Sequence, residues 1–586
     1  MTLSPATFGN EDALPRVPLP ALEDTARRFL EWCAPLLTDD ERARTEKALD
    51  EFLAGEAPEL DAALRTYDAT PGVHSWLDAF WRSRYLGRRD RIALNANFFF
   101  LFQDAPGLGR IERATGLIAA TVGYKLAIDA QAVPPATQRG APLSMEQLKY
   151  LFSACRIPGR EIDTSRTPYT GAWPGPSAER HVVVFHHGHV VRLDVIAPDG
   201  RPHSAAEIAD GLRVVVADTT ARGDAVGHLT TMARPAWAES RDALRAHNAD
   251  ALETIETALF CVALEDTVPG EPREACDVLL HGDSGNRWFD KSLTLIVFGD
   301  GTAGLNGEHC ELDGTTVIGY VDAILGAPTP YLPGAGPCAV TPVRWHLDDA
   351  LRVDIARAGT EFADYAAACA TSTLTIDGVT SRRAKELRCS PDAFAQLAFQ
   401  LAHRRAKGIT GATYESIATR RFHHGRTEAM RVVTPEIVAF VDAMTDPAVG
   451  DDARRAAFRA AADAHVRRAK ECQAGDAPEQ HLWELQWIQR RRGGPDLPFF
   501  DSPGWTILRD DYLSTSAVPS PRIQYFGFGS TSPRCIGVGY GLQHDRFDVY
   551  LATPCAVADR MHVFADRLRE ALAELDGLLA AERSPG

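Results

Sequence analysis

The sequence predicts an α/β protein built from two domains. The chain has 586 residues, and one hydrophobic core stops growing at about 250–300 residues, so two domains of that size are expected. Apolar residues recur at helical spacing in some regions and in β-type runs in others. The length and this mixture of periodicities together define the predicted fold class.

The first half of the chain opens with predicted helices and then turns to strands. Within residues 20–85, Leu30, Cys33 and Leu37 recur at helical spacing. At residues 181–195 the pattern becomes HVVVF, a turn HHGH, and VVRLDV, which predicts a β-hairpin. Residues 292–297 form a further apolar strand. A turn, GDG, and a histidine motif follow, so the candidate chemistry is expected at the end of a strand.

The second half is predicted to be helical and then to end in strands and one helix. The expected helices are 349–371, 391–407, 434–445 and 452–473, the expected strands are 522–528, 535–540 and 546–552, and the expected last helix is 556–581. Glycine- and proline-rich stretches near 264–275 and 326–341 are predicted surface loops.

Charge and cysteine usage exclude several classes of protein. The net charge of −17 and the pI near 5.5 argue against a nucleic-acid partner. Eleven cysteines without a C-x-x-C pair indicate neither a disulfide framework nor a zinc site. No apolar run reaches the roughly 18–20 residues of a membrane helix. The first twenty residues lack a signal-peptide pattern, and the final SPG differs from the peroxisomal SKL. We therefore expect a cytoplasmic, monomeric protein without a membrane span.

The stretch EHCELDG at residues 308–314 is the most informative motif. It places His309 four residues before Asp313 and closes with Gly314. Histidine takes and returns a proton near neutral pH, because its ordinary pKa is about 6.5. Attack of an alcohol or thiol on a thioester needs such a base. The stretch therefore predicts acyl transfer.

This H-x-x-x-D-G pattern resembles that of the coenzyme-A-dependent acyltransferase superfamily. The preceding NRWFDKSL at 286–293 and a later STS at 514–516 narrow the resemblance to the choline/carnitine acyltransferase family, and the Ala- and Arg-rich composition is typical of a bacterial member. Further similar stretches are SPDAF at 390–394, TYES at 413–416 and GRTE at 425–428. Together the similar stretches extend over nearly the whole chain.

The resemblance implies a fold of the chloramphenicol acetyltransferase type. It predicts two similar domains, each a mixed sheet flanked by helices, with the active-site tunnel at their interface. Residues 66–349 would carry the catalytic His309. Residues 1–65 with 350–586 would carry the STS motif and most of the residues that bind CoA and the acceptor.

The resemblance also implies the catalytic roles. His309 would be the general base, and Ser516 would donate a hydrogen bond to the oxyanion. Asp313 would either orient the imidazole or hold the turn through an ion pair, and the sequence leaves both roles open. A second STS at residues 530–532 repeats the letters, but the segments VP, YFG and IGVGY that follow the first triplet in the family identify 514–516 as the motif.

The CoA site is expected in a basic cluster, because CoA carries a 3′-phosphate and a pyrophosphate. Lys385 matches a family lysine just ahead of the SPD segment, and Arg382, Arg383 and Arg388 compensate for a second lysine that is replaced by serine. Asp392 is the acidic residue of the same segment and is included in the predicted site. Acyl-CoA is a co-substrate, and the resemblance implies no bound cofactor or metal.

Acceptor recognition departs from the family pattern. Tyr414 and Thr427 stand where the family binds the carnitine carboxylate, but Gln480 replaces the third residue, an arginine. Glutamine supplies hydrogen bonds without charge, and charge-assisted bonds are about twice as strong. The acceptor is therefore left open among carnitine, choline and another small alcohol.

Four further residues complete the predicted substrate site. Ser514 and Thr515 belong to the STS motif, and Phe526 would meet a trimethylammonium group through cation–π attraction. Gln524 occupies the position that gates the acyl pocket, where a bulky side chain restricts the enzyme to short acyl groups.

The predicted function is transfer of an acyl group, of short chain, between acyl-CoA and the hydroxyl of a small alcohol. Two alternatives remain: a biosynthetic acyltransferase for a natural-product hydroxyl or a carrier-protein thioester, and a catalytically silent acyl-CoA-binding protein. HHGH at 186–189 and the pair His423 and His424 are interpreted as surface or packing residues.

Overall fold

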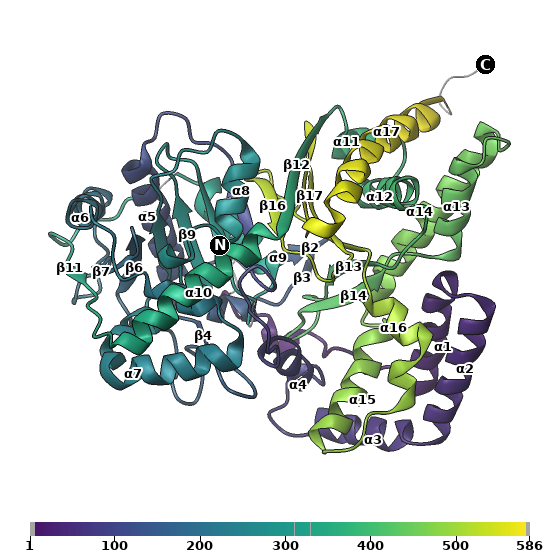
Figure 1. Ribbon diagram of the computed structural model, residues 1–586, viewed down its shortest axis with the longest axis horizontal. Helices are drawn as coiled ribbons and strands as arrows, with labels where there is room; N and C mark the ends of the chain where they lie inside the picture. The colour runs from purple at the N-terminus through teal and green to yellow at the C-terminus, as the bar shows by residue number, and fades with distance from the viewer. Residues whose placement is uncertain (1–5, 310, 329, 582–586) are drawn as a thin grey trace. The chain divides into compact units, whose positions relative to one another are not determined.

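The computed structural model describes residues 6–309, 311–328 and 330–581. The chain divides into two compact units, each with its own mixed sheet and flanking helices (Figure 1), which confirms the predicted α/β class. The first unit comprises Met1–Ala13, Trp81–Cys369 and Ser520–Gly529, and the second comprises Leu14–Phe80, Ala370–Pro519 and Ser530–Gly586.

The limits of these units differ from the domain limits predicted at residues 65/66 and 349/350. The helix Asp349–Ala367 belongs to the first unit, and the segment Ser520–Gly529 also joins it. This segment holds a strand that hydrogen-bonds to Phe98–Phe102, more than 400 residues earlier in the chain. The pairing of strands so distant in sequence leaves no local signal. The sequence pattern therefore predicted the strand but could not assign it to the first unit.

The first unit is organised around an eight-stranded sheet. The parallel pairs β6/β8 and β8/β9 are connected through helices, as parallel strands require, and the remaining pairs are antiparallel. In spatial order the strands are β11 (Val340–Pro342), β7 (His189–Asp194), β6 (His181–His186), β8 (Cys261–Leu264), β9 (Leu293–Val297), β10 (Ala303–Gly307), β1 (Phe98–Phe102) and β16 (Ile523–Phe528).

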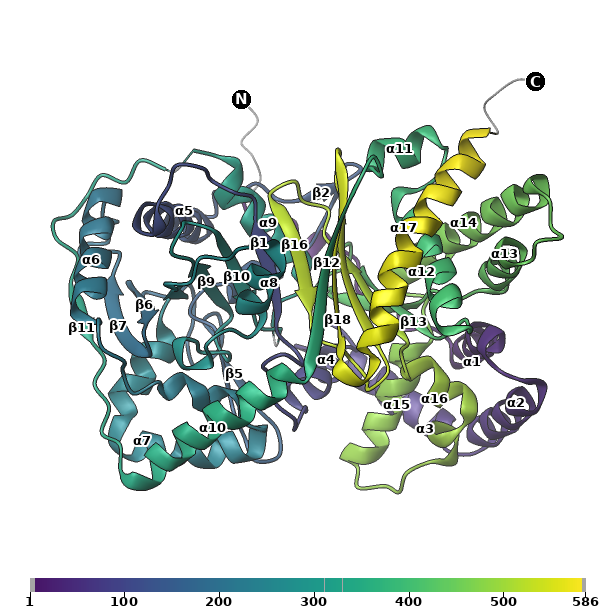
Figure 2. The ribbon, with the colours of Figure 1, turned by 45° about the horizontal axis from the view of Figure 1, so that its top comes forward.

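Helices flank this sheet (Figure 2), and α5 packs against α6 and α9. They are α5 (Arg110–Asp129), α6 (Ala205–Asp218), α7 (Arg234–Thr257), α8 (Pro272–Leu280), α9 (Gly314–Gly326) and α10 (Asp349–Ala367), whereas the short helix α4 (Asp78–Trp81) crosses from the second unit into the first. Two small ribbons pair β2 (Thr137–Gln138) with β3 (Ala141–Pro142) and β4 (Cys155–Ile157) with β5 (Thr164–Arg166).

The second unit has a six-stranded sheet with parallel pairs at its centre. β15 pairs in parallel with both β13 and β17, whereas β14 and β18 are antiparallel to their neighbours β13 and β17. In spatial order the strands are β12 (Cys369–Asp377), β18 (Arg546–Pro554), β17 (Ile536–Leu542), β15 (Leu513–Ala517), β13 (Thr413–Ala418) and β14 (Thr427–Arg431).

The core of the second unit lies between this sheet and the helices α12, α13, α14 and α17. The helices of the unit are α1 (Leu22–Cys33), α2 (Asp39–Ala54), α3 (Ala57–Asp68), α11 (Ser381–Glu386), α12 (Pro391–Lys407), α13 (Pro435–Thr445), α14 (Asp451–Gln473), α15 (Glu479–Arg491), α16 (Pro503–Arg509) and α17 (Ala558–Ala581). Among the described residues of both units, no helix is both long enough and apolar enough to cross a membrane.

Most of the predicted elements are present within a few residues of their predicted ends. The hairpin at 181–195 is β6 and β7, and the helix expected at 391–407 is α12. The strand β10 was missed, because Gly304 and Gly307 break its apolar pattern. A Cβ at Gly304 would lie 2.3 Å from the carbonyl oxygen of Phe100, so this strand needs glycine to approach its neighbour.

Candidate active site

His309 lies in the connection from β10 to α9 of the first unit. The strand ends at Gly307, and the helix begins at Gly314 with Asp313 as its N-cap residue in an extended conformation. The imidazole therefore follows a strand end, as predicted, although the strand is β10 and not the earlier strand at 292–297. Its side chain is about one quarter exposed, at 26%.

The hydrogen bond at Nδ1 defines the tautomer of His309. Nδ1 lies 2.8 Å from the carbonyl oxygen of Leu312, and a carbonyl only accepts hydrogen bonds, so in the neutral ring the proton sits on Nδ1. The basic lone pair is then on Nε2. The ring stacks on Tyr85 with centroids 5.4 Å apart, and Phe98 lies at 4.8 Å. These contacts fix the orientation of the His309 ring, with the lone pair of the neutral ring on Nε2.

Asp313 is held by Gln147. The amide nitrogen of Gln147 donates to Oδ2 of Asp313 at 2.6 Å, and its amide oxygen accepts from the backbone N–H of Asp313 at 2.9 Å and from the hydroxyl of Thr316 at 2.8 Å. Nδ1 of His309 lies 3.8 Å from Oδ1 of Asp313, beyond hydrogen-bond distance. The carboxylate thus faces the imidazole as a nearby charge while the Leu312 carbonyl sets its orientation.

A buried ion-pair network contacts Glu308, the residue before His309. Glu308 accepts from Arg156 at 3.1 Å, Arg156 and Arg234 both pair with Asp163 at 2.6 and 2.7 Å, and Arg234 reaches Asp290 at 2.9 Å. Burial works against ionisation of Asp163, yet the two guanidinium groups hold its pKa below the usual value. Removal of one partner would leave buried charge, so the network fixes Glu308 next to His309 in the chain.

The NRWFDKSL segment contributes to this framework. Trp237 donates its indole N–H to Asp290 at 2.6 Å, and Lys291 donates to the carbonyl of Glu256 at 2.7 Å. Burial raises the pKa of Asp290 and lowers that of Lys291. The motif that helped to identify the family is therefore a buried scaffold.

The strand register of the second unit places four predicted residues on one face of its sheet. Tyr414 is opposite Ser514, and Thr427 is opposite Ala418, four residues after Tyr414 on the same strand. Residues in register point to the same side, and alternate residues of a strand share a face. Tyr414, Thr427, Ser514 and Ser516 consequently share one face of the sheet.

Two glycines leave space beside the serines. Ser514 is opposite Gly537 and Ser516 is opposite Gly539 on β17, so neither serine meets a side chain there. Thr515 points to the other face, where its hydroxyl accepts from Gln396 at 2.8 Å and donates to the carbonyl of Tyr414 at 2.8 Å. These bonds give Thr515 a supporting position, whereas it was predicted as a substrate-binding residue.

The second STS triplet forms a turn ahead of β17. Ser530 donates to the carbonyls of Ser532 and Cys535, and Ser532 donates to the carbonyl of Asp511 at 3.0 Å. The hydroxyls thus close a local turn. This use of the hydroxyls supports the choice of the first triplet as the candidate site.

Gln480 is buried in α15 and oriented by Thr427. Its amide nitrogen donates to the Thr427 carbonyl at 2.8 Å, and its Oε1 is buried with no hydrogen-bond partner among the described residues. Arg431, on the same strand as Thr427, has its guanidinium engaged with Glu479 at 2.6 and 2.7 Å and with Asp511 at 2.6 Å. The position therefore presents an amide oxygen where the family presents an arginine.

The predicted phosphate-binding cations lie on and just after α11. Arg382, Lys385 and Arg388 are exposed, and Arg388 has a left-handed backbone with φ +56°. Arg383 instead pairs with Asp576, with its Nε 2.6 Å from Oδ1. Three of the four predicted cations are thus accessible to solvent.

Asp392 belongs to a hydrogen-bonded network at the start of α12. Its carboxylate accepts from His465 at 2.9 Å and from Tyr540 at 2.7 Å, and Tyr540 also donates to Glu415 at 3.2 Å. Burial disfavours the charge of Asp392, but the bond from His465 lowers its pKa, whereas burial and the nearby Asp392 raise the pKa of Glu415. The carboxylate of Asp392 is therefore engaged by His465 and Tyr540, and its negative charge would not favour a phosphate.

Gln524 and Phe526 lie on β16 and so belong to the first unit. Gln524 occupies a register shift between β1 and β16 and lines a pocket of about 410 Å³ with Leu101, Ala275 and Thr302 among others. Phe526 meets Phe100 edge to face at 5.4 Å. Phe100 is in turn 5.3 Å from Phe98, the ring beside His309, so an aromatic row extends from the candidate base to Phe526.

Sequence reasoning missed Gln147 and the three residues Arg156, Asp163 and Arg234. Gln147 lies 166 residues before Asp313, and no spacing rule connects the two. Arg156 lies in the segment CRIPG at residues 155–159, which also resembles the family pattern.

Comparisons with known proteins show which family the chain resembles along its length. Residues 17–570 match the Choline/Carnitine o-acyltransferase family. The chain is 31% identical over 593 residues to carnitine O-palmitoyltransferase 2, mitochondrial, of Mus musculus, covering 92% of this chain and 88% of that protein. It is 29% identical over 600 residues to human carnitine O-acetyltransferase, covering 97% and 94%.

The chain belongs to the choline/carnitine O-acyltransferase family. It is an acyl-CoA-dependent acyltransferase, as its sequence motifs predicted.

Proposed function

We propose that this chain transfers a short acyl group between CoA and the hydroxyl of a small alcohol. His309 is the general base, Ser516 the oxyanion donor, and Lys385 with Arg382 and Arg388 the phosphate-binding cations. The observation that carries the proposal is the bond from Nδ1 of His309 to the Leu312 carbonyl, because it leaves the lone pair of the neutral ring on Nε2.

The proposed reaction needs one base and one hydrogen-bond donor. Nε2 of His309 removes the hydroxyl proton as the alcohol oxygen attacks the thioester carbonyl carbon. The carbonyl oxygen becomes an oxyanion, which accepts a hydrogen bond from Ser516, and such a donor typically contributes about 3 kcal/mol. The carbon–sulfur bond then breaks, and the imidazolium returns the proton to the CoA sulfur. The negative charge of Asp313 stabilises the imidazolium between these two transfers.

The acceptor is proposed to lack a strongly bound carboxylate. Gln480 turns its N–H toward Thr427, so its free amide oxygen would repel a carboxylate and favour an O–H or N–H donor. This orientation also supports the second candidate, a biosynthetic enzyme that acylates a hydroxyl of a larger alcohol. The retained His309, Ser516 and Lys385 argue against a catalytically silent binding protein.

The preference for short acyl groups rests on Gln524. Its side chain lines the pocket at the β1/β16 register shift, and Gln524→Gly would enlarge that pocket and shift activity toward longer acyl groups. The predicted cytoplasmic location stays a prediction, because one relative named above is mitochondrial by name.

A panel of acyl-CoAs and alcohols tests the proposed function. Release of free CoA thiol is measured with acetyl- to palmitoyl-CoA against carnitine, choline and neutral alcohols. Turnover that needs His309 and favours short acyl groups on a hydroxyl acceptor is expected. An absence of acyl transfer to every alcohol, with tight acyl-CoA binding, would instead support the silent binding protein.

A further inference from the structure

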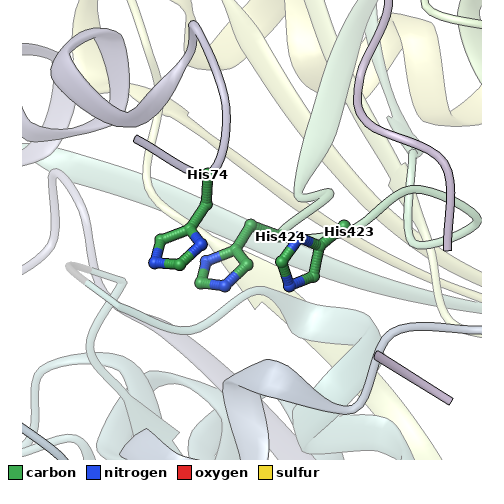
Figure 3. A group of neighbouring side chains, drawn as sticks. All are labelled: His74, His423 and His424. Atoms are coloured by element: carbon green, nitrogen blue, oxygen red, sulfur yellow. The ribbon is translucent and has the colours of Figure 1, made fainter. Parts of the chain in front are cut away.

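Three histidines of the second unit come together from two distant segments. His74 lies in the loop between α3 and α4, and His423 and His424 lie in the turn between β13 and β14; Figure 3 shows the three rings side by side. One nitrogen from each ring lies within 4.8 Å of the others. Ring centroids are 4.1 Å apart for His74 and His424, 4.4 Å for His423 and His424, and 5.4 Å for His74 and His423.

The two segments are tied to a third, the proline-rich stretch near the N-terminus. The Pro15 carbonyl accepts from the backbone N–H of His423 at 2.8 Å. The Pro18 carbonyl accepts from the indole of Trp76, two residues after His74, at 3.1 Å. Both histidine-bearing segments are thus anchored to one stretch of backbone, which keeps the rings together.

The turn that carries two of the rings is tightly constrained. His424 has a left-handed backbone with φ +52°, and a Cβ at Gly425 would lie 2.0 Å from the carbonyl oxygen of Thr419. On the other segment, the carboxylate of Asp78 accepts the backbone N–H of His74 at 3.0 Å. The backbones beneath the rings are therefore preorganised, and side-chain rotation alone adjusts the ring nitrogens.

A second histidine group, around His187, differs because its ring nitrogens already have protein hydrogen-bond partners. Both ring nitrogens of His187 are engaged, with the Thr219 carbonyl and with Asp266, and Asp266 also pairs with Arg110. That guanidinium already neutralises the carboxylate. In contrast, within the part of the chain that the structure describes, no protein group hydrogen-bonds to the ring nitrogens of His74 or His423.

We propose that His74, His423 and His424 bind one divalent transition-metal ion of the Zn²⁺ type. Neutral imidazole is a good ligand for Zn²⁺, Cu²⁺ and Ni²⁺, whereas Ca²⁺ and Mg²⁺ need oxygen ligands. Zn–N bonds of about 2.0–2.1 Å in a tetrahedral site separate the nitrogens by about 3.3 Å. Rotation of the exposed His74 ring from its stacked position closes the remaining gap.

The ion would act as a clamp between two loops and take no part in acyl transfer. Three protein ligands leave a fourth position for water. The site lies in the turn that leads into Thr427, the first residue of β14, which is an edge strand of the sheet. Because each ligand must be neutral, protons compete with the metal, and affinity falls as the pH is lowered.

Metal titration of the full chain tests the site. Cys555, an exposed thiol, is first changed to serine so that it does not bind the probe. Calorimetry with Zn²⁺ is expected to show one site. Loss of an outer-shell partner typically lowers metal affinity about 10- to 100-fold. Loss of a direct ligand in His74→Ala or His423→Gln should lower the Zn²⁺ affinity by more than this. His424→Asn is the third variant, since asparagine tolerates the left-handed backbone. His544→Ala, at a residue whose side chain is 82% exposed, is the matched control and should bind normally.

A spectroscopic readout and a pH comparison complete the test. Bound Cu²⁺ should show splitting from three nitrogen ligands in electron paramagnetic resonance, reduced to two in His74→Ala. Zn²⁺ should raise the melting temperature of the unsubstituted chain at pH 7.5 and much less at pH 5.5. The proposal is overturned if the unsubstituted chain binds no Zn²⁺, or if binding survives all three substitutions unchanged. Circular dichroism of each variant separates loss of a ligand from loss of the fold.

Discussion

Replacing Gln480 by arginine should convert the acceptor site toward carnitine. The glutamine is 4% exposed and donates to the Thr427 carbonyl at 2.8 Å, while its oxygen has no partner within the described residues. A guanidinium at this buried position would supply a charge-assisted bond to a carboxylate, worth about 1.5–3 kcal/mol. That range corresponds to a roughly 10- to 100-fold lower KM for carnitine.

The assay is steady-state kinetics of both proteins with carnitine and with choline. Choline has no carboxylate and would sense an added positive charge, so its KM should stay constant or rise. Gln480→Leu is the control, because it removes the bond to the Thr427 carbonyl without adding charge and should not improve carnitine binding. Efficient carnitine use by the unsubstituted enzyme, with no gain from the arginine, would refute the reasoning and show that another group binds the carboxylate.

Three further predictions concern the catalytic groups. His309→Ala should abolish turnover and leave CoA binding intact by calorimetry, because the base is lost and the phosphate contacts are not; activity above a few per cent would contradict its role. Ser516→Ala should lower kcat about 10²-fold, whereas Ser532→Ala should keep kcat and lose about 1 kcal/mol of stability with its bond to the Asp511 carbonyl; exchanged phenotypes would show that the wrong triplet was chosen. Gln147→Leu should lower kcat with an unchanged KM for acyl-CoA and reduce the unfolding free energy by about 1.5–3 kcal/mol, since it strips a donor from a buried carboxylate; an unchanged kcat would show that this contact does not position the catalytic loop.

Much of the fold was predictable because its elements carry local signals. The helix α12 begins at Pro391 after the cap Ser390 and ends before Gly408, which adopts a left-handed backbone. Such start and stop signals are readable from sequence. β10 was not predicted, because glycines required by close packing replaced the β-branched residues that usually indicate a strand.

Part of the candidate site was likewise predictable from local motifs, and part was not. His309, Ser516, Tyr414 and Thr427 were found because motifs name them, and the register then placed the last three on one face of a sheet. The role of Asp313 stayed open in the sequence, because a spacing of four residues fits both a direct bond and an indirect one. The distance of 3.8 Å to Nδ1 and the bonds from Gln147 favour the indirect role.

The sequence by itself determined which chemical groups the protein has and in what order: a histidine, serine and threonine hydroxyls, a basic cluster, and an amide where the family pattern has an arginine. Only the tertiary structure decided which nitrogen of His309 is basic, which residue holds Asp313, and that His74 meets His423 and His424. The physical reason is that packing brings together side chains from distant segments, and local sequence carries no record of these contacts. Some of these side chains are buried polar groups that must find hydrogen-bond partners.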